Sequence, residues 1–251
     1  MAEWSPTSPD YNWHNWPLDW RYETGIFKLP PGFWAGNDYL ADLDRHENAV
    51  FIRNWLKTPG WAYKSPIKIV DDEPWSDLSI YAFLGNCQVE STLSPALWED
   101  KDFQNPGKGF GLCQWTHRAG PNPLIAWCEE LGLRYYDICV QLGRLMYETS
   151  TGIEWKRSDD FHTIRDWWWA NEDIYDLDYL TTCFMDQYLR PSSADTLPER
   201  QRRAKYWKSY LEKIPYEDPR KGWVTAKSGF NWLYYMKSKN RRIGRNGKSY
   251  F

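Results

Sequence analysis

The sequence predicts an α+β fold that is predominantly helical and has one small β element. Apolar residues recur at helical offsets in several segments, most clearly between Leu78 and Val89. Only residues 109–115 show the short alternation and the glycines of a strand beside a turn. With 251 residues, the chain can form one sizeable core and carry extensions.

Two helices are expected before residue 91. The first covers residues 47–57 and is stopped by a proline–glycine pair. Ser76 can cap the second, which ends near Glu90. Gly85 lies in the middle of this second helix, where glycine costs about 1 kcal/mol relative to alanine. We therefore expect Gly85 to pack closely against another element.

Residues 92–108 are expected to form a loop, followed by the short strand at 109–115. Four helices should come next, and their apolar stripes fall at 124–131, 138–146, 161–168 and 180–188. A last helix is predicted from Thr196 to about residue 213. It begins with Thr196-Leu-Pro-Glu199, a capping-box pattern with proline in the first turn. The chain contains no internal repeat.

Composition limits the function classes. The net charge of −3 gives no overall field that would favour nucleic acid. The chain has no run of 18 apolar residues, so no transmembrane helix is expected, and the first residues lack the features of a secretory signal. The 18 tryptophans and 17 tyrosines can stack on sugars or can fill a core or an interface. We expect most of them in the core or an interface.

The five cysteines favour buried free thiols. Their number is odd and there is no CxxC pair, so no zinc site is indicated. One or two disulfides are the alternative if the protein works outside the cell. Cys87 and Cys113 are candidates for spatial neighbours, because they lie in the two halves of the motif described next.

Two short motifs carry most of the functional information. Residues 82–91 form a helical segment that ends in a single carboxylate, Glu90, and residues 109–116 follow about twenty positions later. Together they resemble the signature of the phage tail lysozyme family, roughly Gly-Asn-x-x-x-Glu-Ser-x-x-x-Pro and then Gly-[Tyr/Phe]-Gly-x-x-Gln-Trp-Thr-x-Arg. The matching residues are Gly85, Asn86, Glu90, Ser91, Pro95, Gly109, Phe110, Gly111, Gln114, Trp115, Thr116 and Arg118.

The resemblance extends over about residues 46–212. Residues 48–57 look like the opening helix of the family, and residues 183–204 look like its closing helix–proline–helix element. The segment 64–74 is longer than the family leads us to expect. The resemblance implies a lysozyme-like domain in which a small β-hairpin lies beside the catalytic helix.

The family resemblance implies that Glu90 is a general acid. Cleavage of a glycosidic bond needs a proton for the leaving oxygen. A carboxyl group can hold that proton near neutral pH if apolar walls desolvate it. Trp98, Phe110 and Trp115 are the residues expected to form such a wall. Because Gln is nearly isosteric with Glu, the sequence predicts that Glu90→Gln removes activity and leaves stability almost unchanged.

A second catalytic carboxylate is less clearly indicated. Retaining glycosidases place it about 5 Å from the acid and inverting ones about 6.5–9.5 Å away. Glu99, Asp100 and Asp102 are the candidates, and Glu99 is favoured because the Trp98-Glu99 pair resembles the family. Two alternatives stay open: Glu99 holds the loop as a hydrogen-bond partner, or the enzyme works with one glutamate.

Six further residues are candidates for substrate binding. Gln114 and Thr116 could bind an N-acetyl group or position a water. Asn86 lies one helical turn before Glu90 and can share its face. The aromatic candidates are Trp98, Phe110 and Trp115. Alternation in a strand would put Gln114 on the same face as Phe110.

Three segments are expected: an aromatic N-terminal arm at 1–45, a lysozyme-like catalytic domain at 46–214, and a C-terminal extension at 215–251. The arm carries five tryptophans without an amphipathic period, and residues 237–251 are basic without any acid. We expect both ends to serve assembly or targeting. The basic tail is either solvated or in contact with anionic wall polymers or acidic neighbours.

The resemblance implies a muramidase that cleaves the glycan backbone of bacterial peptidoglycan. Such an enzyme would be carried on a phage tail in the virion, beside other tail proteins, and would act at the host cell wall. It needs no cofactor and no metal, and neither nucleic acid nor a membrane is expected as a partner. Two rivals are a structural tail component with a degenerate lysozyme fold and, less favoured, a cysteine amidase that uses Cys113 and His117.

Overall fold

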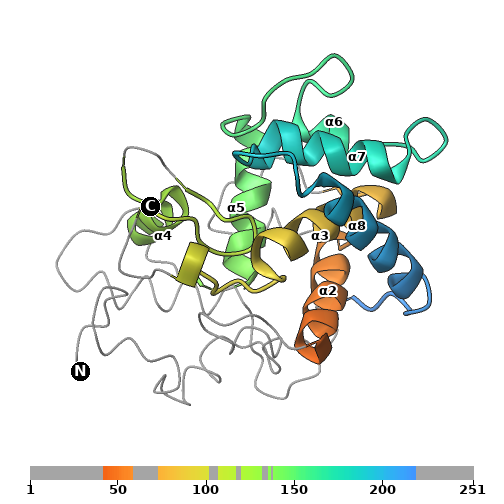
Figure 1. Ribbon diagram of the computed structural model, residues 1–251, viewed down its shortest axis with the longest axis horizontal. Helices are drawn as coiled ribbons and strands as arrows, with labels where there is room; N and C mark the ends of the chain where they lie inside the picture. Colours follow the sequence, from red (N-terminus) through yellow and green to blue (C-terminus); the bar gives the residue numbers. More distant parts are fainter. Residues whose placement is uncertain are drawn as a thin grey trace.

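The computed structural model describes residues 42–58, 73–101, 107–116, 120–131, 135–136 and 138–218, and it is predominantly helical there (Figure 1). The expected aromatic arm, apart from its last residues, lies outside this part of the chain. So do residues 64–72 of the long segment, the basic tail, Asp102, His117 and Arg118. No described helix is both long enough and apolar enough to cross a membrane.

Helix α3 (Asp77–Ser91) forms the centre of the fold (Figure 1). Ser76 caps it as predicted, because the Ser76 hydroxyl accepts a hydrogen bond from the backbone N–H of Ser79. The helix ends where Thr92 turns into the left-handed region at φ 54°. Its residues are buried around nearly the whole circumference, as expected for a helix enclosed by other elements.

The other helices of the described ranges agree with the predicted segments. α2 (Asp42–Leu56) begins before residue 47, and α8 ends slightly before the predicted residue 213. The others are α4 (Pro123–Leu131), α5 (Ile138–Thr151), α6 (Ile164–Trp168), α7 (Leu177–Phe184) and α8 (Leu197–Leu211). A π-helical turn, η5 (Met185–Leu189), continues α7 and ends at Arg190, just before Pro191.

The predicted capping box at the start of α8 is wrong. The Thr196 side chain does not cap the helix, and its hydroxyl instead accepts a hydrogen bond from Arg200 Nε at 3.0 Å. A capping box does occur at α6, where Thr163 and Asp166 exchange side chain–backbone hydrogen bonds.

The predicted β-hairpin is also wrong, since the described ranges contain no strand. Residues 109–115 form a tight reversal in which Phe110 and Trp115 exchange two backbone hydrogen bonds of 3.1 Å. Gly111 at φ 79° and Gln114 at φ 50° are both left-handed, so the chain turns back within four residues. A turn of this kind does not alternate its side chains between two faces, so the shared face of Phe110 and Gln114 is not formed either.

Gly85 packs against another helix, as predicted. A Cβ atom at this position would lie 2.6 Å from the backbone nitrogen of Ala204 and 2.6 Å from the backbone oxygen of Arg200. Both atoms belong to α8, which forms the most extensive helix–helix contact of α3 in the described part of the chain. The absence of a side chain at 85 therefore allows α8 to lie directly on α3.

The core is rich in aromatic rings. Trp75 packs edge-on against Phe83 and Trp167 with ring centroids 5.7 Å away in each case, and Trp167 packs on Phe184 at 4.8 Å. The five cysteines are free and buried, which confirms the favoured interpretation of these residues. In the described region, most tryptophans therefore serve the core, as expected from the sequence.

Candidate active site

Glu90 lies in the last turn of α3, next to the reversal at 109–115. Its side chain keeps 18% of its surface exposed, whereas most of α3 is buried. The carboxylate oxygen Oε1 accepts a hydrogen bond from Arg200 Nη2 at 2.6 Å. No donor in the described part of the chain is seen at the other oxygen, Oε2. One face of this carboxylate is therefore fixed by the protein and the other can meet a ligand.

Arg200 connects Glu90 to the rest of the site, and the sequence analysis did not single it out. Its guanidinium is almost completely buried and makes contacts through all three nitrogens. Nε donates to Thr196 Oγ1, Nη1 donates to Asn86 Oδ1 at 3.2 Å, and Nη2 donates to Glu90. Arginine suits this position because its planar group directs donors to several acceptors at once.

Asn86 is fully buried one turn before Glu90. Its amide nitrogen donates to the backbone oxygens of Ala82 and Thr181, at 2.9 and 3.0 Å. Its amide oxygen accepts from Arg200. Asn86 thus joins α3, α7 and α8 and supports the arginine from behind. A direct substrate contact, as predicted from the sequence, is not available to a buried side chain.

The reversal at 109–115 is held in place by buried polar side chains. Gln141 on α5 accepts a hydrogen bond from Leu112 N at 2.9 Å and donates to the backbone oxygens of Pro95 and Tyr135. Its amide group lies only 2.6 Å from the position that a Cβ atom at Gly111 would take, which explains the glycine there. Ser91 connects the same segment to α3, because its hydroxyl oxygen lies 3.0 Å from Cys87 O and 3.1 Å from Leu112 O and its one proton is available to either acceptor.

Trp115 belongs to a buried polar network. Its indole N–H lies 3.1 Å from Glu148 Oε2 and 3.1 Å from the Tyr188 hydroxyl. The Tyr188 hydroxyl donates to Glu148, and Arg144 pairs with the other oxygen of Glu148 at 2.5 Å. Burial raises the pKa of Glu148, while the contacts with Arg144, Tyr188 and Trp115 oppose that shift. Trp115 therefore fixes the reversal to α5 and η5.

The aromatic candidates lie inside the protein. Phe110 is fully buried, and Trp98 and Trp115 keep 2% and 6% of their surface. The rings of Trp98 and Phe110 pack on each other with centroids 4.7 Å apart. With so little exposed surface, these rings support the reversal beside Glu90. Stacking on a sugar would need a free ring face, which they do not offer.

Glu99 holds the loop that precedes the reversal. Its Oε2 accepts a hydrogen bond from Gly109 N at 2.8 Å, and its backbone N–H donates to Gly109 O at 2.8 Å. It opens the short 3-10 turn η4 (Glu99–Lys101), in which Asp100 pairs with Lys108 at 2.8 Å. Glu99 thus has the loop-holding contacts that the sequence analysis offered as the alternative to catalysis.

Gln114 and Thr116 are the polar candidates of the reversal. Gln114 is half-buried, and its amide nitrogen donates to the oxygens of Leu97 and Gly111 at 3.0 and 2.9 Å. Thr116 is exposed and donates to the oxygen of Gly107 at 2.9 Å. Thr116 is thus the more accessible of the two, while Gln114 is engaged in shaping the turn.

Cys87 and Cys113 lie side by side, as the sequence suggested. Their sulfur atoms are 3.8 Å apart and both thiols are buried between α3 and the reversal. Burial and the neighbouring Cys87 raise the pKa of the Cys113 thiol well above its ordinary value. A thiol held in its neutral form is a poor nucleophile, which argues against the cysteine amidase.

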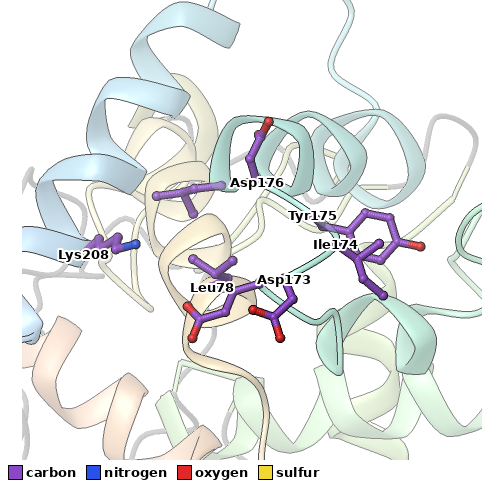
Figure 2. A pocket seen from close by; sticks show the side chains of 8 residues that line it. Leu78, Asp173, Ile174, Tyr175, Asp176 and Lys208 are labelled. Carbon is purple, nitrogen blue, oxygen red and sulfur yellow. The ribbon is translucent and has the colours of Figure 1, made fainter.

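An open pocket is found at the opposite end of α3 from Glu90. Leu78 lines it together with the 172–177 segment and Lys208 (Figure 2). Twelve residues separate Leu78 from Glu90 along the helix, which corresponds to about 18 Å. Figure 2 shows the carboxylate of Asp173 near Leu78 and Lys208 on the facing helix. The pocket contains none of the motif residues and is not part of the candidate active site.

A sequence model of the phage tail lysozyme family matches residues 67–211. This range covers more than half of the chain and contains both motifs and α8. The chain belongs to the phage tail lysozyme family. The resemblance to this family, inferred from the two motifs, is thereby confirmed.

One relative of this phage tail lysozyme family member is Morphogenesis protein 1 of Bacillus phage B103. It is 29% identical over 175 residues, which are 70% of this chain and 42% of that protein. The chain therefore spans less than half the length of this relative. The two comparisons establish a phage-associated, lysozyme-like protein.

Proposed function

We propose that this protein is a muramidase that cleaves the glycan backbone of bacterial peptidoglycan. One observation carries the proposal. Glu90 is a partly exposed carboxylate at the end of a buried helix, held by a buried arginine on one oxygen only. Fixing one oxygen while leaving the second for a ligand suits a group that transfers a proton to a bound substrate.

In the proposed reaction Glu90 is protonated on Oε2 when substrate is bound and donates this proton to the oxygen of the leaving sugar, and Arg200 stabilises the carboxylate that forms. The adjoining sugar develops oxocarbenium character as the bond breaks. Arg200 keeps the Oε1 side of the carboxyl group fixed throughout, so the donating oxygen does not rotate away. The reversal at 109–115 is fixed by Gln141, Ser91 and Trp115, and it would form the adjoining wall of the site.

The second step is proposed to proceed without a second carboxylate of the 99–100 segment. Glu99 accepts a backbone hydrogen bond and Asp100 pairs with Lys108. A mechanism with one glutamate, in which groups of the substrate itself assist, agrees with these contacts. Both hydrolysis and intramolecular transglycosylation start from the same proton transfer by Glu90.

The biological setting is proposed from the family and the phage relative. The protein would be carried on the phage tail and would open the host wall locally during entry, in contact with other tail proteins. The N-terminal arm and the basic tail are proposed to serve assembly or targeting.

The test uses purified wild type and Glu90→Gln on peptidoglycan embedded in a renaturing gel. We expect a cleared band for wild type and none for the variant. Mass spectrometry of the released muropeptides should show cleavage between the two amino sugars, and the end groups distinguish hydrolysis from transglycosylation. Cleared bands of equal strength would overturn the role of Glu90.

A structural tail component with a degenerate lysozyme fold is the second candidate function. The name of the phage relative, a morphogenesis protein, favours it. If the folded wild-type protein releases no muropeptide from purified peptidoglycan, the result supports the structural tail component over the muramidase.

A further inference from the structure

We infer that Arg200 is a positioning residue for Glu90, so that α8 is a functional part of the active site. This inference rests on the proposed function and adds a residue to it. Arg200 lies 110 residues after Glu90 in the sequence, yet its Nη2 is 2.6 Å from the carboxylate. The side chains of Arg200 and Glu90 keep only 3% and 18% of their surface, so the pair is shielded from water on the arginine side.

The surroundings of Arg200 determine where its charge lies. Thr196, the residue just before α8, accepts a hydrogen bond from Nε, and the side-chain oxygen of Asn86 accepts one from Nη1. Asn86 is fixed in turn by Ala82 and Thr181. Because each nitrogen of the guanidinium has its own acceptor, the group cannot rotate without losing several hydrogen bonds at once. The direction of Nη2 toward Glu90 is thereby set.

The approach of the two helices makes this geometry possible. The backbone oxygen of Arg200 itself lies only 2.6 Å from the position that a Cβ atom at Gly85 would take. Gly85 therefore brings the Arg200 backbone onto α3, five residues before Glu90. The guanidinium then spans Asn86 and Glu90, which lie one helical turn apart on the same face.

Arg200 acts on the reacting carboxyl group in two ways: it holds Oε1 in place, and it stabilises the carboxylate that remains after proton transfer. Within α3, Glu90 is the one charged residue that pairs with Arg200, and the pair involves Oε1 of the carboxyl group. When Arg200 is replaced by a neutral residue, the carboxyl group can turn about its last bond and Oε2 leaves its position. A misplacement of about 1 Å lowers the rate by as much as about 100-fold. Because the loss concerns orientation in the transition state, we expect it in kcat rather than in KM.

Arg203 provides a matched control for the test. It lies on the same helix and also pairs with a glutamate at 2.6 Å, but its partner is Glu199 on the solvent side of α8. Arg203→Gln removes the same charge and one ion pair from α8 without changing any contact of Glu90.

The experiment measures kcat and KM of the full chain on soluble, peptide-free glycan strands from bacterial wall. Wild type, Arg200→Gln, Arg200→Lys, Arg203→Gln and Glu90→Gln are compared, and circular dichroism gives the folded fraction of each. We expect Arg200→Gln to lower kcat by up to about 100-fold while KM stays within about twofold. Arg200→Lys should recover part of the loss, because lysine supplies the charge without the fork of donors. Arg203→Gln should match wild type.

Three results would overturn the inference. The first is an Arg200→Gln kcat equal to that of wild type. The second is an activity loss that only follows the loss of folded protein in both Arg200 variants. The third is an inactive wild type, which also overturns the proposed function. If Arg200→Gln does not fold, Arg200→Lys decides: a lowered kcat at unchanged KM supports positioning, and an unchanged kcat contradicts it.

Discussion

Gly85 and Ala204 lie closer together than any residue with a side chain at 85 would allow. A Cβ atom at Gly85 would be 2.6 Å from the Ala204 nitrogen and 2.7 Å from its Cβ atom. This contact sets the distance between α3 and α8, and with it the reach of Arg200 toward Glu90.

Gly85→Ala should therefore destabilise the protein. The added methyl group meets backbone atoms of α8, which cannot move as a side chain can, so we expect a loss of about 1–3 kcal/mol in the free energy of unfolding. Urea unfolding measures it. Ser209→Ala, at an exposed position on α8, serves as the control and should change little. An equally stable Gly85→Ala would mean that the helices can separate freely.

Glu90→Gln should lower stability as well as activity. The sequence alone predicts almost no change, because the two side chains are nearly isosteric. The ion pair changes this expectation, since the buried Arg200 loses its counter-charge and keeps only an amide oxygen as acceptor. We expect a loss of about 1–3 kcal/mol by urea unfolding, and a fall of activity by about two to four orders of magnitude. An unchanged unfolding curve would show that the pair contributes nothing.

Glu99 should matter much less for activity than Glu90. Glu99→Gln keeps an oxygen that can accept from Gly109 N, so activity should fall by less than about tenfold, against the hundredfold or more of a proton-transfer group. Glu99→Ala removes the acceptor and should loosen the loop. Wall-lysis rates of both folded variants are the measurement. A Glu99→Gln protein as inactive as Glu90→Gln would assign Glu99 as the second catalytic carboxylate.

Tyr188→Phe tests the network behind Trp115. The change leaves the buried Glu148 with one donor fewer and removes a partner of the Trp115 indole, so we expect a loss of about 1–3 kcal/mol. Tyr210→Phe is the control, because Tyr210 packs through ring contacts with His46 and Trp207. Equal unfolding free energies for the two variants would contradict a structural role of the network.

Glu199→Gln should remove a small, pH-dependent contribution to stability. Arg202, followed by Arg203, lowers the pKa of Glu199 from 4.5 to about 2. A carboxyl group with a lowered folded-state pKa stabilises the folded state above its ordinary pKa and loses this effect as the pH falls toward about 2. The pair is solvent-exposed, so wild type should exceed the variant by at most about 1 kcal/mol at neutral pH. Urea unfolding across this pH range should show the difference vanish in acid; a constant difference would contradict it.

The helices could be predicted from the sequence, but the conformation of residues 109–115 could not. Apolar periodicity and the Ser76 cap located α3 and its neighbours within a few residues. The strand predicted for residues 109–115 is wrong, because glycines and a short alternation of apolar and polar residues occur in tight turns as well as in strands. Two features make this segment a turn rather than a strand. One is the left-handed backbone of Gln114, a non-glycine residue, and the other is the side chain of Gln141, 27 residues further along the chain. A local sequence pattern indicates neither.

The same reasoning explains why the sequence found Glu90 but missed its partner. Glu90 stands near the end of a recognisable helix, five residues after the glycine that allows close packing. Arg200 is one of three arginines among residues 200–203, and only the structure shows that this one points inward while Arg202 and Arg203 pair with Glu199. A local pattern cannot tell which arginine in such a group is buried.

Helix α8 is synthesised well after α3, and this delay affects how the chain folds during translation. At about 5–20 residues per second, roughly 5 to 20 seconds pass between the synthesis of Glu90 and that of Arg200. Throughout this interval the nascent chain carries α3 without the helix that contacts it most extensively. An apolar helix left uncovered favours aggregation, so we expect a chaperone to shield the growing chain until α8 emerges. A polypeptide that ends before Arg200 would have Glu90 but would lack both the helix that covers α3 and the charged partner of Glu90.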